Sequence, residues 1–346
     1  MASEVGKSKG VIAELGTLEQ GARNAVEVCM SVKPSERVLV LADLASLEVG
    51  QAIYDAAQQV SKGNVKLLVL EDFTERPAEQ LPTAIADMIQ RADVTFYTAE
   101  GQPEEYPVRM TFMRNAVKFA RHAHMPNITP ELMRTGMCAD YIEVSRITKR
   151  IEQAVKGCRK ARVVNSAGTD LELEFHPSWK WKASDGLYHR KGMWGNLPDG
   201  EIFTAPFTGN GRIVIEELGD WFSPKYGLLS KTPVSLQVED SRVDPSSVCC
   251  TNEQLVKELE EYLRTDRNSN RLCEFAIGTN VFLQYLTGNL LQDEKFPTVH
   301  CAFGNAYPEE TGASWESSTH VDAIVLKSTV SVDDRKIMDE GRLLVG

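Results

Sequence analysis

Strand-like and helix-like segments alternate through the first third of the chain, and this alternation constrains the fold more than any other feature. Apolar β-rich runs occupy residues 37–44, 65–73 and 93–99, and helical spacing is found at 48–60, 84–92 and 106–123. Strands that alternate with helices pair in parallel, because a crossover helix carries the chain back to the same end of the sheet. The pattern predicts an α/β fold whose N-terminal domain is Rossmann-like, with a parallel sheet.

The second half of the chain has a different pattern. After a helical connector at 142–159, residues 162–176 alternate polar and apolar side chains with a period of two. Further short strands are predicted at 200–206, 212–218, 234–240 and 320–326, with one helix at 252–266. We therefore predict two domains: an α/β scaffold at 1–158, and an α+β domain with a mixed or antiparallel sheet at 159–346.

Charge and cysteine content restrict the partners and the compartment. The net charge of −11 disfavours nucleic acid, and the chain has no apolar run long enough to cross a membrane. The N-terminal "MASEVGKSKGVIAELG" lacks the apolar core of a signal peptide. The seven cysteines show no CxxC spacing, which favours reduced thiols over a disulfide framework. A cytoplasmic protein without a nucleic-acid or membrane partner is expected.

The first domain is not expected to bind a nucleotide. The turn after the first strand, "LADLASLE", contains no glycine, whereas a dinucleotide site needs glycines for the tight turn and the close approach of the pyrophosphate. The sequence GxxxxGK[ST] is also absent. We expect a scaffold that binds neither NAD, FAD nor ATP.

The histidines fall into two groups. Four are predicted to be solvated or locally hydrogen-bonded, the first two on or just past the helix at 106–123 and the others in loops: His122, His124, His176 and His189. The other two, His300 and His320, lie in apolar surroundings. His320 precedes Asp322 by two residues, so on a strand both side chains point to the same face.

Two glutamates share this unusual setting. Glu201 opens "EIFTAP" and Glu274 lies inside "RLCEFAIGTN", where a charged carboxylate is costly to bury unless it is paired or coordinated. Taken singly, each residue has a structural explanation: a strand end, a hydrogen-bonded core histidine, or a salt bridge to Arg271 or Lys295. Together, three carboxylates and two imidazoles in one domain indicate a metal site.

Five ligands exceed what one catalytic ion takes while keeping an open position. Oxygen and imidazole nitrogen suit Zn²⁺, Mn²⁺, Co²⁺ or Fe²⁺. The set therefore predicts two divalent ions, about 3.5–4 Å apart, with a bridging carboxylate.

The blocks "NLPDGEIFTAP", "EFAIGTN", "EKFPTVHCAFGNAY" and "STHVDAIV" resemble the aminopeptidase T and aminopeptidase S family of metallopeptidases. The resemblance is clearest from about Gly168 to Leu326. It implies metal-ligand roles for Glu201, Glu274, His300, His320 and Asp322, with Tyr307 seven residues after His300, and a homodimer. Tyr307 is the candidate that hydrogen-bonds the developing oxyanion.

The sequence departs from this family at two places. Its members often carry two consecutive glutamates before FTAP, and the first is Gly200 here, so no general base is identified. The interval between His300 and His320 is also compressed, which leaves the substrate preference open.

A related branch, the iron-dependent 2,5-dihydroxypyridine dioxygenases, keeps the H-x-D pair and holds one Fe(II) with two histidines and one carboxylate. In that branch a histidine replaces the residue matching Glu274, and the glutamate matching Glu201 is lost. Retention of both favours an aminopeptidase that hydrolyses the N-terminal bond of small peptides, with Glu201 and Tyr307 as catalytic candidates. A mononuclear Fe(II) ring-cleaving dioxygenase and a non-catalytic small-ligand-binding protein are the alternatives.

Overall fold

The computed structural model describes residues 15–344. The prediction about a signal peptide concerns residues 1–16, nearly all of which lie outside the described residues. Four strands from the first half of the chain and one from residues 194–196 build a five-stranded parallel sheet in the order β2-β1-β3-β4-β8. Its strands are β1 (Val38–Ala42), β2 (Val65–Val69), β3 (Val94–Tyr97), β4 (Arg121–His124) and β8 (Trp194–Asn196). Around the sheet lie α1 (Leu18–Arg23), α2 (Leu47–Ser61), α3 (Thr83–Ile89), α4 (Tyr106–Phe119) and α5 (Pro130–Arg134), with a short π-helix at Asn24–Cys29. The helix α6 (Tyr141–Val155) leads to the antiparallel sheets, and its residues Ile151 and Val155 pack into their core.

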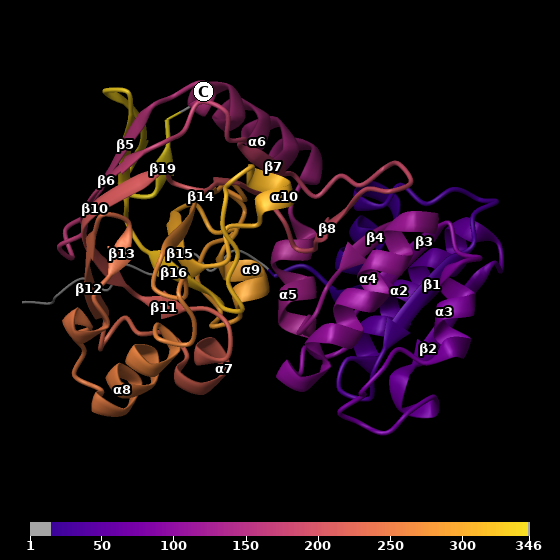
Figure 1. Ribbon diagram of the computed structural model, residues 1–346. Helices are drawn as coiled ribbons and strands as arrows, with labels where there is room; N and C mark the ends of the chain where they lie inside the picture. The colour runs from indigo at the N-terminus through magenta and orange to yellow at the C-terminus, as the bar shows by residue number, and fades with distance from the viewer. Residues whose placement is uncertain (1–14, 345–346) are drawn as a thin grey trace, which may run out of the picture.

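Apolar helices cover both faces of this sheet, which is why every residue of β1 is buried. Val38 and Val40 belong to one apolar cluster, which contains Val49 and Ile53 of α2. The alternate residues Leu39 and Leu41 belong to another, with α3 and α4. This doubly wound layer is the right-hand body in Figure 1.

The segment after α4 differs from the prediction. The helix was expected to run to residue 123, but it ends at Phe119 and the chain enters β4. His122 and His124 are therefore buried on a strand. Of the two predicted settings, the solvated one is wrong and the locally hydrogen-bonded one is observed. His122 Nδ1 lies 2.9 Å from Thr95 Oγ1, and His122 Nε2 lies 3.2 Å from His124 Nδ1. Their burial lowers the pKa of both, to about 3 for His122.

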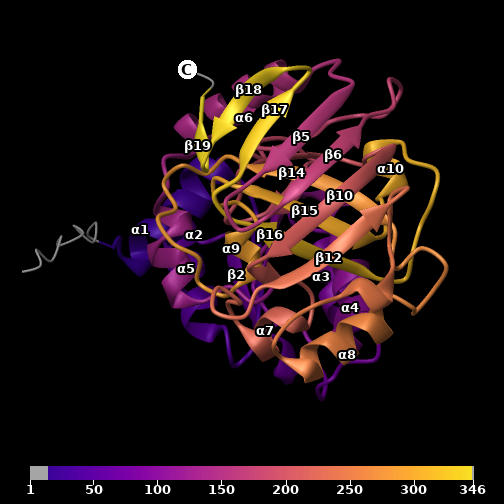
Figure 2. The same ribbon diagram turned by 90° about the vertical axis from the view of Figure 1, so that its left-hand side faces the viewer.

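The second half contains two antiparallel sheets, which Figure 2 shows one in front of the other. The eight-stranded outer sheet has the order β13-β12-β10-β6-β5-β17-β18-β19. Its strands are β5 (Lys160–Val164), β6 (Asp170–Glu174), β10 (Thr208–Ile215), β12 (Val234–Glu239), β13 (Arg242–Val243), β17 (Thr329–Val332), β18 (Arg335–Asp339) and β19 (Arg342–Leu343).

The six-stranded sheet, called the site sheet below, has the order β11-β16-β15-β14-β9-β7. Its strands are β7 (Lys182–Ser184), β9 (Glu201–Thr204), β11 (Glu217–Leu218), β14 (Leu272–Gly278), β15 (Val299–Gly304) and β16 (His320–Val325). Four helices accompany these sheets: α7 (Phe222–Tyr226), α8 (Glu253–Tyr262), α9 (Leu290–Asp293) and α10 (Pro308–Thr311).

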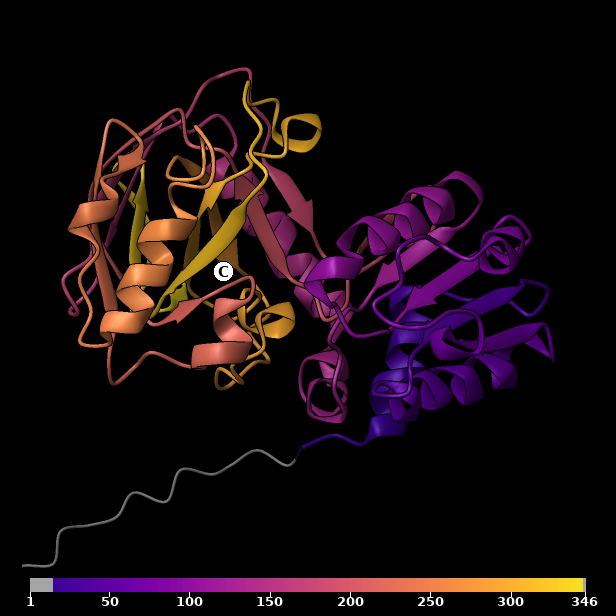
Figure 3. The ribbon, with the colours of Figure 1, turned by 60° about the horizontal axis from the view of Figure 1, so that its bottom comes forward.

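The largest apolar core lies between the two antiparallel sheets. Leu171 and Leu173 of the outer sheet share one cluster with Phe275, Cys301 and other residues of the site sheet. On β6 the exposed and buried residues alternate, whereas β14, β15 and nearly all of β16 are buried throughout. The outer sheet therefore covers one face of the site sheet, and the other face points toward the parallel sheet (Figure 3).

The predicted fold class, α/β with a parallel sheet first and an antiparallel arrangement later, is confirmed. The division at 158/159 stays a prediction, and β8, from residues 194–196, joins the parallel sheet beside β4. Among residues 15–344, no helix combines the length and the apolar character that crossing a membrane requires.

Candidate metal centre

Strand register gathers polar side chains on the face of the site sheet that is turned away from the outer sheet. Ala302, in the middle of β15, pairs with Glu274 of β14 on one side and Asp322 of β16 on the other. His300 precedes Ala302 by two residues and so points to the same face. The opposite face, with Cys301 and its neighbours, packs into the apolar core.

Strand pairing also positions the two remaining predicted ligands, Glu201 and His320. Glu201 of β9 pairs with Gly278, which lies four residues after Glu274 and shares its face. His320 pairs with Gly304 at the end of β15. A side chain at Gly278 or Gly304 would meet the backbone oxygen of Phe296 or Thr319, so both positions next to these ligands need glycine.

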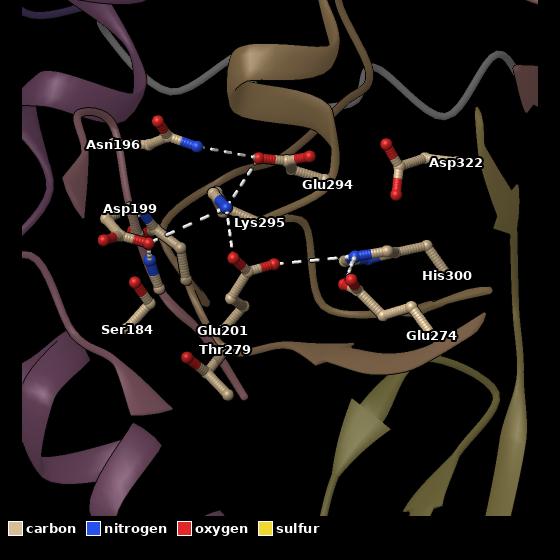
Figure 4. Close-up of polar contacts among 12 residues, drawn as sticks. Ser184, Asn196, Asp199, Glu201, Glu274, Thr279, Glu294, Lys295, His300 and Asp322 are labelled. Atoms are coloured by element: carbon tan, nitrogen blue, oxygen red, sulfur yellow. Dashed lines mark hydrogen bonds and ion pairs between the residues drawn. The ribbon is translucent and has the colours of Figure 1, made fainter. Parts of the chain in front are cut away.

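Glu274 lies between the two imidazoles, as expected of a bridging carboxylate. Its Oε1 is 3.3 Å from His300 Nε2, and its Oε2 is 3.8 Å from His320 Nε2. Asp322 Oδ1 is 3.4 Å from His320 Nε2 on one flank, and Glu201 Oε2 is 3.5 Å from His300 Nε2 on the other. Figure 4 shows Glu201, Glu274 and His300 directed toward one another.

A buried ammonium group completes the cluster. Lys295 Nζ lies 2.5 Å from Glu201 Oε1, 2.6 Å from Glu294 Oε1 and 3.8 Å from Asp199 Oδ1 (Figure 4). Asn196 of β8 donates a 3.4 Å hydrogen bond to the same Glu294 oxygen, which connects the parallel sheet to the centre. Glu274 and Asp322, which lie beside the histidines, bring the number of carboxyl groups in the cluster to five, against one ammonium group.

Burial and the neighbouring charges shift the pKa values of three groups in this cluster. Burial opposes protonation of His300, but Glu274, Glu201 and Asp322 outweigh burial and raise its pKa to about 9. Burial, reinforced by neighbouring carboxylates, raises the pKa of Glu294 to about 7. Burial acts against the charge of Lys295, yet its carboxylate partners hold its pKa well above the ordinary value.

The donor set fits divalent metal ions. Two groups of three residues have ligand atoms within 4.8 Å of one another: Glu201, Glu274 and His300, and Glu294, His300 and Asp322. Glu201 Oε2 is buried and accepts no hydrogen bond from the described protein atoms, so it can bind a cation. Carboxylate oxygen and imidazole nitrogen are ligands that Zn²⁺, Mn²⁺, Co²⁺ and Fe²⁺ accept.

The structure brings together all five residues predicted as ligands and places Tyr307 beside them. The ring centres of Tyr307 and His320 are 4.7 Å apart. Burial, followed by the charges of Glu274 and Asp322, raises the pKa of Tyr307 against the opposing effect of His320, so the phenol stays protonated at neutral pH. The assignment of these residues as ligands and catalytic groups stays a prediction.

Three residues of the cluster were not predicted as ligands: Asp199, Glu294 and Lys295. Glu294 and Lys295 form the "EK" of "EKFPTVH", which by itself has the composition of an exposed turn. Lys295 was considered only as a salt-bridge partner, and it does pair with Glu201. Arg271, the other such candidate, instead stacks on Trp315, with its guanidinium carbon 3.5 Å from the ring centre.

The two loop histidines agree with prediction. His176 Nδ1 lies 2.7 Å from Ser178 Oγ, and His189 Nε2 lies 2.8 Å from the carbonyl oxygen of Val28. The first contact is local, and both lie at the surface.

Two solved structures share this fold over nearly their whole length. The 2,5-dihydroxypyridine dioxygenase from Pseudomonas putida KT2440 superposes with a TM-score of 0.72 and 16% identity, covering 95% of this chain and 97% of that one. Wild-type AmpT from Thermus thermophilus superposes with a TM-score of 0.68 and 16% identity, covering 95% and 99%. No protein with a curated function matches the sequence.

The fold and the site together describe an α/β enzyme whose parallel sheet faces a centre rich in carboxylate and histidine side chains. This centre lies on an antiparallel sheet. The sequence model of the NicX family, described as 2,5-dihydroxypyridine 5,6-dioxygenase, matches residues 129–345, more than half of the chain. The chain belongs to this family. The branch that was predicted as related is therefore the family shown, and the likeness to AmpT is one of fold.

Proposed function

We propose that the protein is a metal-dependent aminopeptidase that hydrolyses the first peptide bond of small peptides at a dinuclear centre. One observation carries the proposal: Glu274 lies between the imidazoles of His300 and His320 and presents one oxygen to each. A single iron held by two histidines and one carboxylate has no use for Glu201 and Glu274 as well.

The predicted ligands would form two metal-binding groups. Glu201, Glu274 and His300 would hold one ion, and His320 and Asp322, with the second oxygen of Glu274, the other. Bound ions of this kind lower the pKa of a water molecule and polarise the scissile carbonyl group. Lys295 holds Glu201 Oε1, so that Oε2 is directed into the centre.

Tyr307 lies at the open side of the centre. Its side chain is next to His320. The phenol group is shielded from solvent, although 39% of the surface of the whole residue is exposed. Because the raised pKa keeps the phenol protonated, it can donate a hydrogen bond to the oxyanion that develops on the carbonyl.

The second candidate is a mononuclear Fe(II) dioxygenase that cleaves an aromatic ring, and family membership favours it. His300, His320 and Asp322 would supply two histidines and one carboxylate. In this case Glu201 would be a structural partner of Lys295, and its charge would not be needed for iron binding.

Metal content separates the two functions. We expect about two Zn²⁺, Co²⁺ or Mn²⁺ ions per chain in the fully loaded wild type. Glu201→Gln keeps the size but removes the charge, so occupancy should fall and hydrolysis of leucine p-nitroanilide should decrease at least about 100-fold. Glu79→Gln, at an exposed position on the parallel-sheet side, is the matched control.

Other outcomes of the same measurements would support the alternative functions. One iron per chain, ring opening of 2,5-dihydroxypyridine, no peptidase activity and an unaffected Glu201→Gln variant would establish the dioxygenase. Bound metal without turnover of either substrate would indicate a binding protein. A homodimer remains a prediction that sedimentation equilibrium can test.

A further inference from the structure

Three arginines line one pocket in the second half of the chain. Arg242, Arg267 and Arg271 share a space of about 390 Å³, called the arginine pocket below, which Trp315 and Glu316 also line. The volume is within the range of sites for small organic molecules. The whole chain has a net charge of −11, so this concentration of positive charge runs against its overall composition.

The three guanidinium groups have no carboxylate partner. Among residues 15–344, no carboxylate forms an ion pair with Arg242, Arg267 or Arg271, and this includes Glu316, which is exposed. In the same part of the chain, no acceptor takes a hydrogen bond from the guanidinium group of Arg267 or Arg271. Their N–H donors are therefore available to a bound anion.

The fold holds these like charges together. Arg242 of β13 and Arg271 pair in an isolated antiparallel bridge, and like charges directly opposite each other on neighbouring strands are destabilising. Burial, followed by the charges of Arg242 and Arg267, lowers the pKa of Arg271. An anion bound between the arginines would offset this repulsion.

Hydrogen bonding and stacking fix two of the guanidinium groups in place. Arg242 Nη1 donates 2.8 Å hydrogen bonds to the carbonyl oxygen of Arg267 and to Asn270 Oδ1. The guanidinium carbon of Arg271 lies 3.5 Å from the centre of the Trp315 ring. Side chains that are already ordered lose less conformational entropy when a ligand binds.

The two segments that form the pocket are joined to each other. Asn268 Nδ2 donates a 2.8 Å hydrogen bond to the carbonyl oxygen of Glu316. Asp266 Oδ2 accepts hydrogen bonds of 2.9 Å from Ser317 Oγ and 2.8 Å from Ser318 Oγ. The acid that is adjacent to Arg267 in the sequence is thus engaged by hydroxyl groups, and it does not neutralise the arginines.

We propose that the arginine pocket binds the phosphate group of a small anion. A phosphate group presents oxygens in several directions, so separate guanidinium groups can each bind one, whereas a carboxylate presents two oxygens in one plane. The pocket volume leaves room for an organic group attached to the phosphate. The assignment does not depend on the proposed function, because none of these arginines is a predicted metal ligand.

Isothermal titration calorimetry on the full-length chain tests this assignment. Metal is first removed with a chelator, so that phosphate cannot bind to ions at the metal centre. Inorganic phosphate, glycerol 3-phosphate and succinate would be titrated at low ionic strength. We expect both phosphates to bind saturably and at least about 10-fold more tightly than succinate. Tighter binding of glycerol 3-phosphate would identify a phosphate ester as the ligand class, and tighter binding of inorganic phosphate would identify the free ion.

Variants of the arginines give the decisive comparison. Arg267→Met changes an exposed side chain that makes no hydrogen bond within residues 15–344, so it should fold normally and weaken phosphate binding at least about 10-fold. Arg271→Met should have a similar effect, and Arg271→Lys should restore part of the affinity. Arg264→Met, at an exposed position that does not line the pocket, is the matched control and should stay within about twofold of wild type.

Thermal unfolding gives a second readout. Phosphate stabilises many proteins without binding to a site, so its effect relative to chloride must be compared between wild type and Arg267→Met. The wild type should gain more from phosphate than the variant does. The assignment would be overturned by the absence of saturable phosphate binding, by unchanged affinity in both Arg267→Met and Arg271→Met, or by succinate binding as tightly as phosphate.

Discussion

Gly200 explains at the residue scale why one glutamate of the aminopeptidase pattern is missing. Its φ is +131°, and a Cβ atom there would lie 2.8 Å from Val144 Cγ1 and 3.1 Å from the backbone nitrogen of Asn280. A side chain at this position would be both strained and crowded. The general base of a peptidase must therefore come from elsewhere in the site.

We expect Gly200→Ala to lower the free energy of unfolding by about 1–3 kcal/mol. Gly288→Ala is the control, because Gly288 also has a positive φ but an added Cβ would have no neighbour within 4 Å. Urea unfolding of both variants separates crowding from backbone strain. Equal losses would show that Val144 and Asn280 do not exclude a side chain.

Removal of Lys295 should destabilise the fold, because its ammonium group pairs with three buried carboxyl groups. Lys295→Met would leave Asp199, Glu201 and Glu294 buried without their cation, and loss of one partner of a buried ion pair costs about 3–5 kcal/mol. Added Zn²⁺ or Mn²⁺ should recover part of this loss, because it offsets the same carboxylates. Thermal unfolding with and without metal measures both effects, with the exposed Lys118→Met as the control.

At the scale of elements, the register of three strands determines the space available for metal ions. Ala302 lies between Glu274 and Asp322, so Ala302→Leu should fill that space. We expect metal content to fall by at least half, with a stability loss of about 1–3 kcal/mol from overpacking. Elemental analysis and circular dichroism test this; full metal content in a folded variant would show that the ions lie elsewhere.

A buried acidic pair connects β11 to α9 and should make stability depend on pH. Burial, then the charge of Asp293, raises the pKa of Glu217 from 4.5 to about 9, and Ser223 donates a 2.9 Å hydrogen bond to its Oε1. Between these two pKa values the folded state holds a proton that the unfolded state releases. Stability from this group is therefore complete below pH 4.5 and is lost as the pH rises toward 9.

Glu217→Gln should remove this dependence, because the amide is neutral at every pH. Between pH 5.5 and pH 8 the wild type should lose roughly 1–3 kcal/mol more than the variant. Urea unfolding at the two pH values provides the comparison, with the exposed Glu253→Gln as the control. Parallel pH profiles for wild type and Glu217→Gln would contradict the prediction.

Elements with a strong local pattern could be predicted from the sequence, whereas elements defined by distant partners could not. β1 and α2 appear within a residue or two of their predicted bounds, because each buries a continuous apolar run or stripe. β4, "RHAH", was missed because its polar residues continue the helical pattern of α4, and only neighbouring strands make them a strand.

The residues of the site also fall into those that a local pattern predicts and those that depend on distant partners. The shared face of His320 and Asp322 follows from the two-residue period of a strand, so it could be predicted locally. The contribution of Glu294 could not, because it depends on α9 and on Lys295, whose partners Asp199 and Glu201 are about a hundred residues away.

At the scale of the whole molecule, β8 makes the parallel sheet depend on the second half of the chain. A fragment of residues 1–158 lacks β8, which pairs with β4 and places Trp194 6.1 Å from the His124 ring. We expect the amides of β4 to exchange much faster with solvent in the fragment than in the intact chain, because its edge is unpaired. Equal protection by hydrogen-exchange mass spectrometry would show that residues 1–158 fold independently.

This arrangement also sets an order of events during synthesis on the ribosome. β1, β2, β3 and β4 emerge first and can associate early, but the fifth position of their sheet stays open until residues 194–196 have left the exit tunnel. By then the chain has already produced β5, β6 and β7. The partners of β6 and β7, which include β10 and β9, follow soon, whereas β5 pairs with β17, which is translated near the end of the chain. The nascent chain must therefore keep unpaired strand edges away from neighbouring polypeptides until translation is nearly complete, which makes it a natural client for chaperones that shield such edges.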